Sequence, residues 1–372
     1  MNPGRSRRKA GPVTNSPSVR RSLFLHAPIR RKPATVLREL LRHVDDDTPP
    51  DAPVAALERR LADLLGKESA LLFPTGTMAQ QVALRIHASR RGAPAFAAHP
   101  QSHLHVWENQ GYSVVHGLRF HPTGDRHELM TEADLAEIAE PLAAVVWELP
   151  QRDLGGLLPE WDDLRAQTEL VRARGAAVHM DGARLWEAQT YYRRPFHEIA
   201  GLFDSVDSVY VSLYKSLQGF SGGVLLGDAA TIAEAGVWRS RLGGQAYQPW
   251  PVALAALAGL DTVLPRMAAF REHAIALATA INKDGAARAW PDPPQTPMFH
   301  VHLPAGRRAA EAAGAAMLAE HGTQLFPRVR SSPDPARSSF EITVGENAME
   351  FTPEEVVGLL HELLERCGTT TT

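Results

Sequence analysis

Two short apolar segments that each end in a polar residue most strongly constrain the fold of this 372-residue chain. One covers residues 176–180 and is followed by Asp181, and the other covers residues 208–214 and is followed by Lys215. Both are partly β-branched and are flanked by segments with a helical pattern, which is typical of buried parallel strands. In an open α/β sheet the ligand crevice lies beyond the carboxyl ends of the strands. The sequence therefore predicts Asp181 and Lys215 at one crevice.

Lys215 is distinctive because lysine is rare in this chain. The others are Lys9 and Lys32 in a basic N-terminal segment, and Lys67 and Lys283 in polar segments that we expect to be exposed. Lysine can form an imine with an aldehyde, whereas arginine stays protonated. A carboxylate can hold a pyridine nitrogen in its protonated form. The pair therefore indicates a pyridine aldehyde cofactor, and the alternative is a lysine that extends to solvent at a strand end.

Strand-like and helical segments alternate through about residue 255, which predicts a large α/β domain with a mostly parallel sheet flanked by helices. The other strands of this domain are expected at residues 70–73, 95–98, 113–115, 143–148 and 222–227. A long helical segment, 251–280, leads into an α+β pattern. We therefore expect a large domain over residues 23–255, and a linking helix with a small domain over 256–372. Residues 1–22 are basic and are expected to form a disordered tail.

The composition narrows the possible partners. With 39 basic and 42 acidic residues, the net charge of −3 creates no general attraction for nucleic acid. The single cysteine excludes an intrachain disulfide and fits a reducing, cytoplasmic compartment. No apolar run approaches the roughly 20 residues that span a membrane. Residues 20–25 superficially resemble a twin-arginine export signal, but the apolar stretch after them is too short.

A second candidate site lies where the strand at 70–73 meets the following helix. The turn at 74–77 places backbone N–H groups and a hydroxyl at a helix N-terminus, which suits a phosphate but is also an ordinary helix cap. Ser212, three residues before Lys215, can reach the same phosphate. His103 and His105 are compatible with ring stacking on a cofactor, a metal pair or a plain surface position, and no acid or cysteine cluster completes a metal site.

Three motifs carry a resemblance to a known family. They are PTGTMA at 74–79, HMDGARL at 179–185, and Lys215 followed by a glycine-rich run. These motifs resemble those of the threonine aldolase and β-eliminating lyase family, which comprises pyridoxal phosphate enzymes of fold type I. The resemblance covers nearly everything after about residue 23. It implies a large cofactor-binding domain with a mostly parallel sheet, and a small α+β C-terminal domain.

The resemblance also implies roles for individual side chains around the cofactor. Lys215 binds the cofactor aldehyde, Asp181 pairs with the ring nitrogen, and His103 stacks on the ring. Arg184 lies near a cofactor oxygen or the substrate carboxylate. The residues expected to hold the phosphate are Gly76, Thr77 and Ser212.

The chain departs from the family where the substrate is bound. The family's histidine-containing loop is replaced by residues 149–153, which contain Arg152 and Asp153 and no histidine. The family has a segment with the pattern W-R-x-x-x-G-G-G-x-R, and Tyr247 stands here in place of its last arginine. The C-terminal arginine that would bind the substrate carboxylate has no clear match. The candidates are Arg337, which lies nearest, and Arg328 and Arg330; Arg152 is a further candidate from the altered loop. These changes indicate a divergent branch.

The reaction implied is retro-aldol cleavage of a β-hydroxy-α-amino acid into glycine and an aldehyde. The base for the hydroxyl stays open among His105, Asp153 and a water bound to the phosphate. The alternatives are β-elimination or amino transfer on the same cofactor, or a non-catalytic pyridoxal phosphate fold that serves as a binding protein. Trp147, Trp186 and the tyrosines at 191 and 192 favour a larger apolar substrate group if they line the crevice, and otherwise belong to the core.

The resemblance also implies a homodimer or homotetramer. In this fold type the second chain usually completes the site, and the segment 238–248 is the one that would reach across. Its aromatic and arginine content suits an interface.

Overall fold

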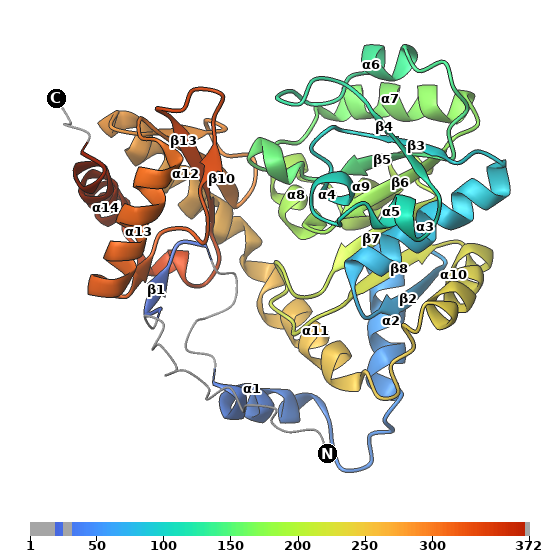
Figure 1. Cartoon of the computed structure of the whole chain (residues 1–372). Helices are drawn as coiled ribbons and strands as arrows, with labels where there is room; N and C mark the ends of the chain where they lie inside the picture. The colour runs from blue at the N-terminus through green and yellow to red at the C-terminus, as the bar shows by residue number, and fades with distance from the viewer. Residues whose placement is uncertain (1–18, 25–31, 369–372) are drawn as a thin grey trace, which may run out of the picture.

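The structure is a computed structural model that describes residues 19–24 and 32–368. Its larger domain is built on a seven-stranded sheet in the order β2-β8-β7-β6-β5-β3-β4 (Figure 1). The strands in that order are β2 (Ser69–Phe73), β8 (Gly223–Gly227), β7 (Ser208–Ser212), β6 (Ala177–Gly182), β5 (Ala144–Glu148), β3 (Ala95–Ala98) and β4 (Arg119–Pro122). β8 runs antiparallel to both neighbours, and all other pairs are parallel. The predicted, mostly parallel sheet is confirmed.

Helices cover both faces of this sheet, which explains why the central strands are buried along their whole length and mostly apolar. Their bounds are α2 (Ala52–Leu65), α3 (Gly76–Arg91), α6 (Glu132–Ala136), α7 (Trp161–Ala173), α8 (Leu185–Tyr192), α9 (Phe196–Gly201) and α10 (Ala229–Arg241). The α3 helix begins where the Thr75 hydroxyl accepts a hydrogen bond from Met78 N. It ends at Gly92, whose left-handed φ of 63° suits glycine.

The C-terminal domain contains a four-stranded antiparallel sheet in the order β12-β13-β10-β9. Its strands are β9 (Arg288–Trp290), β10 (Met298–Leu303), β12 (Arg330–Ser331) and β13 (Ser338–Thr343), and its helices are α12 (Met267–Asp284), α13 (Arg307–His321) and α14 (Pro353–Arg366). Side chains such as Val301 and Phe340 are fully buried in the core that the helices share with one face of the sheet. The alternate positions, including His302 and Glu341, are polar and belong to the other face.

Apart from the 13-residue helix α11, the remaining elements are short. They are β1 (Arg21–Ser22), α1 (Pro33–Leu40), α4 (His103–Val106), α5 (Gly111–Val114), α11 (Trp250–Thr262) and β11 (Thr323–Gln324), with 3₁₀ turns η1 (Leu41–His43), η2 (Arg152–Leu154), η3 (Leu264–Arg266) and η4 (Ala348–Glu350).

Four expectations need correction. Residues 113–115 are not a strand: helix α5 occupies this segment, and the strand follows at β4. The exposed side chains of Val114 and Val115 explain the error, because a strand at this position would have been buried. The expected tail of residues 1–22 contains β1, which pairs with β11 of the small domain; residues 1–18 lie outside the described residues.

The expected linking helix is interrupted by η3, where Pro265 cannot donate a backbone hydrogen bond. The whole run Trp250–Asp284 is nevertheless long and apolar enough, by length and composition, to cross a membrane, contrary to the expectation from the sequence. Half of its most apolar window is buried within the fold, and the buried side chains of α12, such as Phe270 and Leu277, belong to the main hydrophobic core. A core helix accounts for the same pattern.

Candidate functional site

The carboxyl edge of the large sheet brings Asp181 and Lys215 into one buried site. Asp181 pairs in register with Tyr210 of the neighbouring strand β7, and Lys215 follows that strand by three residues. The Asp181 carboxylate is buried, with Oδ1 accepting from Ala183 N at 3.1 Å. Its Oδ2 has no hydrogen-bond partner among the described residues. Because buried carboxylate oxygens are almost always hydrogen-bonded, this oxygen fits the protonated nitrogen of a bound pyridine ring.

The surroundings of Lys215 favour a reactive amine. Burial, followed by the nearby charge of Arg184, lowers the pKa of Lys215 to about 8. A lysine with this pKa is partly neutral near physiological pH and can attack an aldehyde. Lys283 is exposed as expected, whereas Lys67 is half-buried and donates from Nζ to the carbonyl of Val206 at 2.8 Å.

A cavity of about 330 Å³ lies beside Lys215, within the size range of small-molecule sites. Gly76, Thr77 and His103 line it together with Lys215, so the structure brings these predicted residues together. A Cβ at Gly76 would lie 1.9 Å from Oη of Tyr210, so only glycine fits at this end of α3. The Ser212 hydroxyl is also buried, without a well-placed partner among the described residues. A helix N-terminus with no side chain in the way and a spare hydroxyl fits a phosphate.

His103 is held at the mouth of this cavity by two glutamates. Its Nδ1 lies 3.3 Å from Oε1 of Glu108, and its backbone N–H donates to Glu148 Oε2 at 3.0 Å. His105 behaves differently: its Nδ1 is 3.0 Å from the hydroxyl of Tyr112, its ring stacks on Phe120, and it does not line the cavity. The position of His103 agrees with a stacking role, while His105 is not placed to act as a base.

The candidate arginines occupy different environments. Arg184 is buried, and its closest carboxylates, those of Glu187 and Glu341, lie 3.9 Å away. Its Nε, which faces Glu187 at that distance, has no hydrogen-bond partner among the described residues. Arg152 is buried too, but its Nε donates to Glu341 at 3.0 Å. Arg337 is exposed and pairs with Asp334, at 3.4 Å. Of the three, Arg184 has the most hydrogen-bonding capacity left for a substrate.

Asp153 is already engaged, which argues against its expected role as a base. Its Oδ1 accepts from Arg330 at 2.7 Å, and its Oδ2 accepts from Trp107 Nε1 at 3.1 Å. Both carboxylate oxygens are therefore already used by the protein itself and do not face a substrate hydroxyl as free acceptors.

Two buried carboxylates escaped the sequence reasoning. Glu148 ends β5, directly opposite Asp181, and burial followed by the Asp181 charge raises the pKa of Glu148 to about 7. Burial alone would raise the pKa of Glu341, but the guanidiniums of Arg152 and Arg184 outweigh it and lower that pKa to about 2. The signal for Glu148 was available, because it ends an apolar run as Asp181 does. Glu341 gives no such signal, since its partners are distant in sequence.

Comparison with known proteins places this geometry in context. Residues 43–304 match the family described as β-eliminating lyase. The low-specificity L-threonine aldolase 1 of Arabidopsis thaliana is 30% identical over 323 residues, covering 83% of this chain and 88% of the plant protein. The chain belongs to the β-eliminating lyase family.

Structural comparisons of this β-eliminating lyase agree with that assignment. A crystal structure from Listeria monocytogenes, assigned as an L-allo-threonine aldolase, superposes with a TM-score of 0.85 at 32% identity, covering 94% of this chain and 97% of the other. A serine palmitoyltransferase from Sphingomonas wittichii superposes with a TM-score of 0.69 at 18% identity, covering 93% of this chain and 88% of the other, and shows the shared fold alone. The expected family and the fold type I architecture are confirmed.

The aromatic residues that were candidates for a large substrate pocket pack within the main hydrophobic core of this lyase or, as partly buried side chains, against it. Trp147 donates to Gln167, and Trp186 is fully buried in the main core. The hydroxyls of Tyr191 and Tyr192 bond to Glu160 and to the carbonyl of Pro159. The core interpretation is therefore correct for these four residues, and the cofactor cavity is instead bordered by the half-exposed rings of Tyr214 and Phe220.

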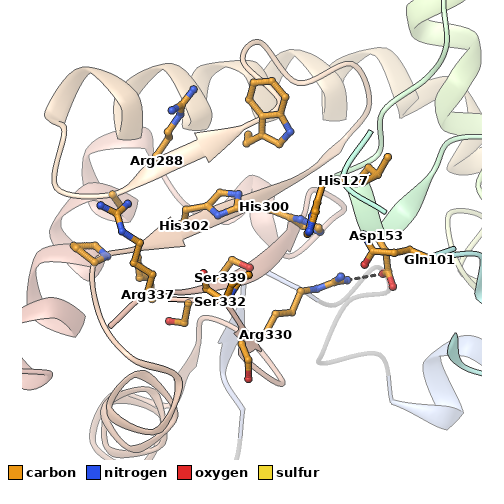
Figure 2. Close-up of a pocket in the computed structure, with 18 of the residues that line it drawn as sticks. Gln101, His127, Asp153, Arg288, His300, His302, Arg330, Ser332, Arg337 and Ser339 are labelled. Carbon is orange, nitrogen blue, oxygen red and sulfur yellow. Dashed lines mark hydrogen bonds and ion pairs between the residues drawn. The ribbon is translucent and has the colours of Figure 1, made fainter. Parts of the chain in front are cut away.

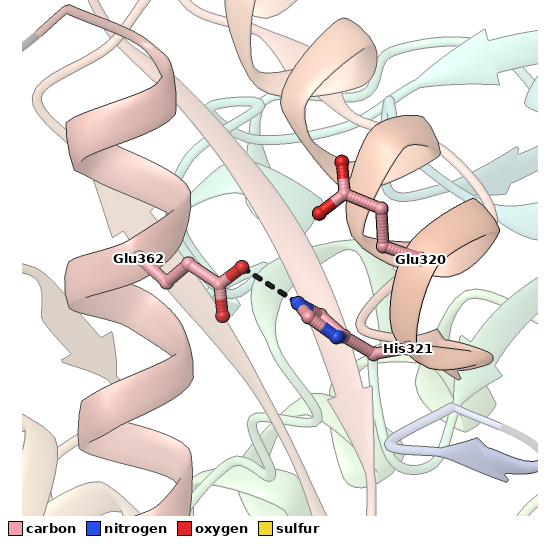
Figure 3. Close-up of side chains that lie close together, drawn as sticks. All are labelled: Glu320, His321 and Glu362. Atoms are coloured by element: carbon pink, nitrogen blue, oxygen red, sulfur yellow. Dashed lines mark hydrogen bonds and ion pairs between the residues drawn. The ribbon is translucent and has the colours of Figure 1, made fainter.

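One group of metal-ligand side chains lies on the small domain of the lyase, far from Lys215 in sequence. Glu320, His321 and Glu362 converge on the exposed side of α13 and α14 (Figure 3). Arg366 forms ion pairs with both carboxylates, at 2.6 Å and 2.8 Å, and His321 Nε2 lies 2.9 Å from Glu362. Both carboxylates are already paired with Arg366, so the group carries no metal assignment.

Proposed function

We propose that this protein cleaves β-hydroxy-α-amino acids into glycine and an aldehyde, with pyridoxal phosphate as its cofactor. It is a carbon–carbon lyase of the threonine aldolase type. The observation that carries the proposal is the free, buried Oδ2 of Asp181 beside a lysine whose pKa is lowered to about 8. When bound, the cofactor supplies an electron sink for the carbanion that forms at the substrate Cα.

The side chains of this site would each perform one task. Asp181 keeps a proton on the ring nitrogen, and Lys215 provides the amine that anchors the aldehyde. His103, held by Glu108 at 3.3 Å, covers the ring. The phosphate would be held by Gly76 and Thr77 at the N-terminus of α3, together with the hydroxyl of Ser212 from β7. The tasks of orienting the substrate and accepting its proton fall to other groups.

Arg184 is the side chain best placed to hold the substrate carboxylate. Arginine binds a carboxylate through two parallel hydrogen bonds. The unpartnered Nε of Arg184 leaves one such donor available in the buried site, and Arg184 lies close enough to lower the pKa of Lys215. Arg152 is already bonded to Glu341, and Arg337 is on the exposed side of the small domain. For the β-hydroxyl proton, the engagement of His105 and Asp153 leaves a water at the phosphate as the acceptor.

The names of the relatives support a retro-aldol reaction over its alternatives. They include low-specificity L-threonine aldolases from Arabidopsis thaliana and Escherichia coli, the latter 29% identical over 253 residues. Because the loop that carries the family's histidine is replaced here, we expect weak activity on free threonine and better activity on a bulkier substrate such as phenylserine. Equal amounts of glycine and aldehyde would support the proposal. Ammonia with a keto acid would support β-elimination, and a keto acid without free ammonia would support amino transfer to the cofactor. No turnover with bound cofactor would support a binding protein.

A homodimer, or a homotetramer built from it, is the proposed assembly, and the proposed compartment is the cytoplasm. Tyr247 in the segment 238–248 is 95% exposed, and Phe220 and Tyr214 border the cofactor cavity with half-exposed rings. Exposed aromatic side chains around a ligand cavity are typical of a surface that a second chain covers. The proposed interface therefore lies over the cofactor cavity.

A further inference from the structure

A second cavity, of about 940 Å³, lies between the two domains of the described structure and is not the cofactor cavity. On the large-domain side it is lined by Gln101, Trp107 and Asp153, and on the small-domain side by the polar face of the β9-β10-β13-β12 sheet (Figure 2). Gln101 and His103 lie two residues apart and line the large and the small cavity respectively. The segment 101–108 is therefore a wall shared by both cavities.

The register of the small sheet builds a row of polar side chains across this cavity. His302 pairs with Arg288 on one side and with Ser339 on the other, and Ser339 pairs with Arg330. Residues that pair in register lie on the same face of a sheet, with strands roughly 4.8 Å apart. We call these four residues the cationic row; it spans about 14 Å, from three strand spacings. Its Arg330 end is bonded to Asp153 of the large domain.

The charge in this cavity is unbalanced, although the chain as a whole carries a net charge of −3. Four arginines line it, Arg126, Arg288, Arg330 and Arg337, against a single acid, Asp153. Asp153 pairs with Arg330, and Asp334, which does not line the cavity, pairs with Arg337 at 3.4 Å, while no carboxylate within the described residues forms an ion pair with Arg288. An ordinary solvated sheet face would carry charges of both signs, so the excess of positive charge indicates an anionic ligand.

Two histidines in the row's neighbourhood support a ligand. Partial burial and then the charges of Arg288 and Arg337 lower the pKa of His302, which keeps its ring neutral and able to donate one hydrogen bond. His300 lines the same cavity and is only 5% exposed, yet its Nε2 has no partner within the described residues. Trp107 and Trp290, also lining residues, are 38% and 41% exposed and offer flat apolar surface. The cavity thus combines cations, a free buried donor or acceptor, and aromatic walls.

We propose that the cationic row binds a carboxylate or phosphate at the far end of the substrate's side chain. The substrate would then be a β-hydroxy-α-amino acid whose side chain ends in an anionic group. This side chain would extend from the cofactor cavity across the segment 101–108 into the larger cavity. This inference rests on the proposed function, and it assigns Arg288, Arg337 and His302 to substrate specificity. It also gives Arg337 a different role from the α-carboxylate contact predicted from the sequence.

The test compares phenylserine with 4-carboxyphenylserine, which differs only by a distal carboxylate. Retro-aldol cleavage of either breaks the Cα–Cβ bond, transfers the hydroxyl proton to the base, and adds a proton at Cα to give glycine and the aldehyde. The holoenzyme should have a higher kcat/KM for the carboxylated substrate. Arg288→Gln should lower that value by about tenfold, as expected for loss of one charge-assisted hydrogen bond, and leave phenylserine within about twofold. Arg308→Gln, on exposed α13 outside the cavity, should change neither.

Direct binding separates this proposal from the proposed function. Benzene-1,4-dicarboxylate, titrated calorimetrically into the holoenzyme, should bind, and Arg288→Gln should weaken it about tenfold whether or not the enzyme is a lyase. If neither amino acid is cleaved, the proposed function fails, and this titration alone decides whether the cationic row binds a carboxylate. Equal loss for both substrates in Arg288→Gln, or dicarboxylate binding that the variant leaves unchanged, would overturn the proposal. Binding of inorganic phosphate that Arg288→Gln abolishes, without any preference for 4-carboxyphenylserine, would show a site for a free anion and also overturn it.

Discussion

Glu148 and Asp181 lie directly opposite each other on neighbouring parallel strands, so two buried carboxyl groups meet at the edge of the sheet. They differ in their partners. Glu148 accepts hydrogen bonds from the backbone of His103 and Arg152, whereas Asp181 keeps one oxygen free. Repulsion between the two adjacent carboxylates adds to burial in raising the pKa of Glu148 to about 7. The free oxygen of Asp181 is the one that is available to a protonated pyridine nitrogen.

Asp181→Asn should leave the fold intact and weaken cofactor binding by roughly 10- to 150-fold, because the lost charge-assisted hydrogen bond is worth about 1.5–3 kcal/mol. Asparagine preserves the Oδ1 contact to Ala183 N. Turnover should fall further than binding, since the ring nitrogen would lose its proton. Cofactor titration by fluorescence and steady-state rates at saturating cofactor measure the two effects. Near-wild-type turnover would show that another group holds the nitrogen.

Lys215→Ala should abolish the visible absorption band of the cofactor-bound protein, and Lys283→Ala, a matched change at an exposed lysine, should not. Cofactor uptake by the wild-type apoprotein should also depend on pH. Because only the neutral amine attacks an aldehyde and the pKa of Lys215 is about 8, the rate should rise as pH increases toward 8 and level off above it. Stopped-flow absorbance measures this profile. A retained band in Lys215→Ala would contradict the assignment.

A site residue could be predicted from the sequence where the residues next to it in the chain indicate its position in the fold. Asp181 and Lys215 end local apolar runs, so a few neighbouring residues suffice to place them at a sheet edge. The predicted roles of His105 and Asp153 as bases were wrong for a different reason. Tertiary packing brings Tyr112 and Phe120 against His105, and Arg330 against Asp153, and these contacts leave no local signal in the sequence. Likewise, β1 forms only because β11, some 300 residues later, offers it a partner.

The cationic row illustrates the same limit. Arg288, His302, Ser339 and Arg330 are far apart in the chain and have no shared motif, and strand register alone aligns them. The sequence alone indicates Arg330 and Arg337 as candidate arginines, but it does not indicate the cavity that they share.

Glu148→Gln should remove a pH-dependent loss of stability in the apoprotein. The pKa of this carboxyl rises from 4.5 to about 7 on folding, so the unfolded chain releases its proton first as pH increases. Its contribution to the free energy of unfolding therefore falls between about pH 4.5 and 7, by up to about 3 kcal/mol. Urea unfolding at pH 5 and pH 8 measures this. The stability of the wild type relative to the variant should be lower at pH 8 than at pH 5; a pH-independent difference would contradict the shift.

Tyr247→Glu should weaken the homodimer by at least about tenfold, because a carboxylate would be buried in place of an exposed aromatic ring. Val114→Glu, at another exposed apolar position outside the segment 238–248, serves as the control. Sedimentation velocity over a dilution series gives both dissociation constants. A fully active wild-type monomer at nanomolar concentration would exclude the proposed interface.

The most direct test of the central claim is the product balance from phenylserine with the holoenzyme. We predict glycine and benzaldehyde in equal amounts, with no ammonia, at a kcat/KM above that for threonine, and no products from Lys215→Ala. Ammonia with a keto acid would contradict retro-aldol cleavage. Equal or better use of threonine would leave the reaction intact and show that the altered loop at 149–153 is compensated.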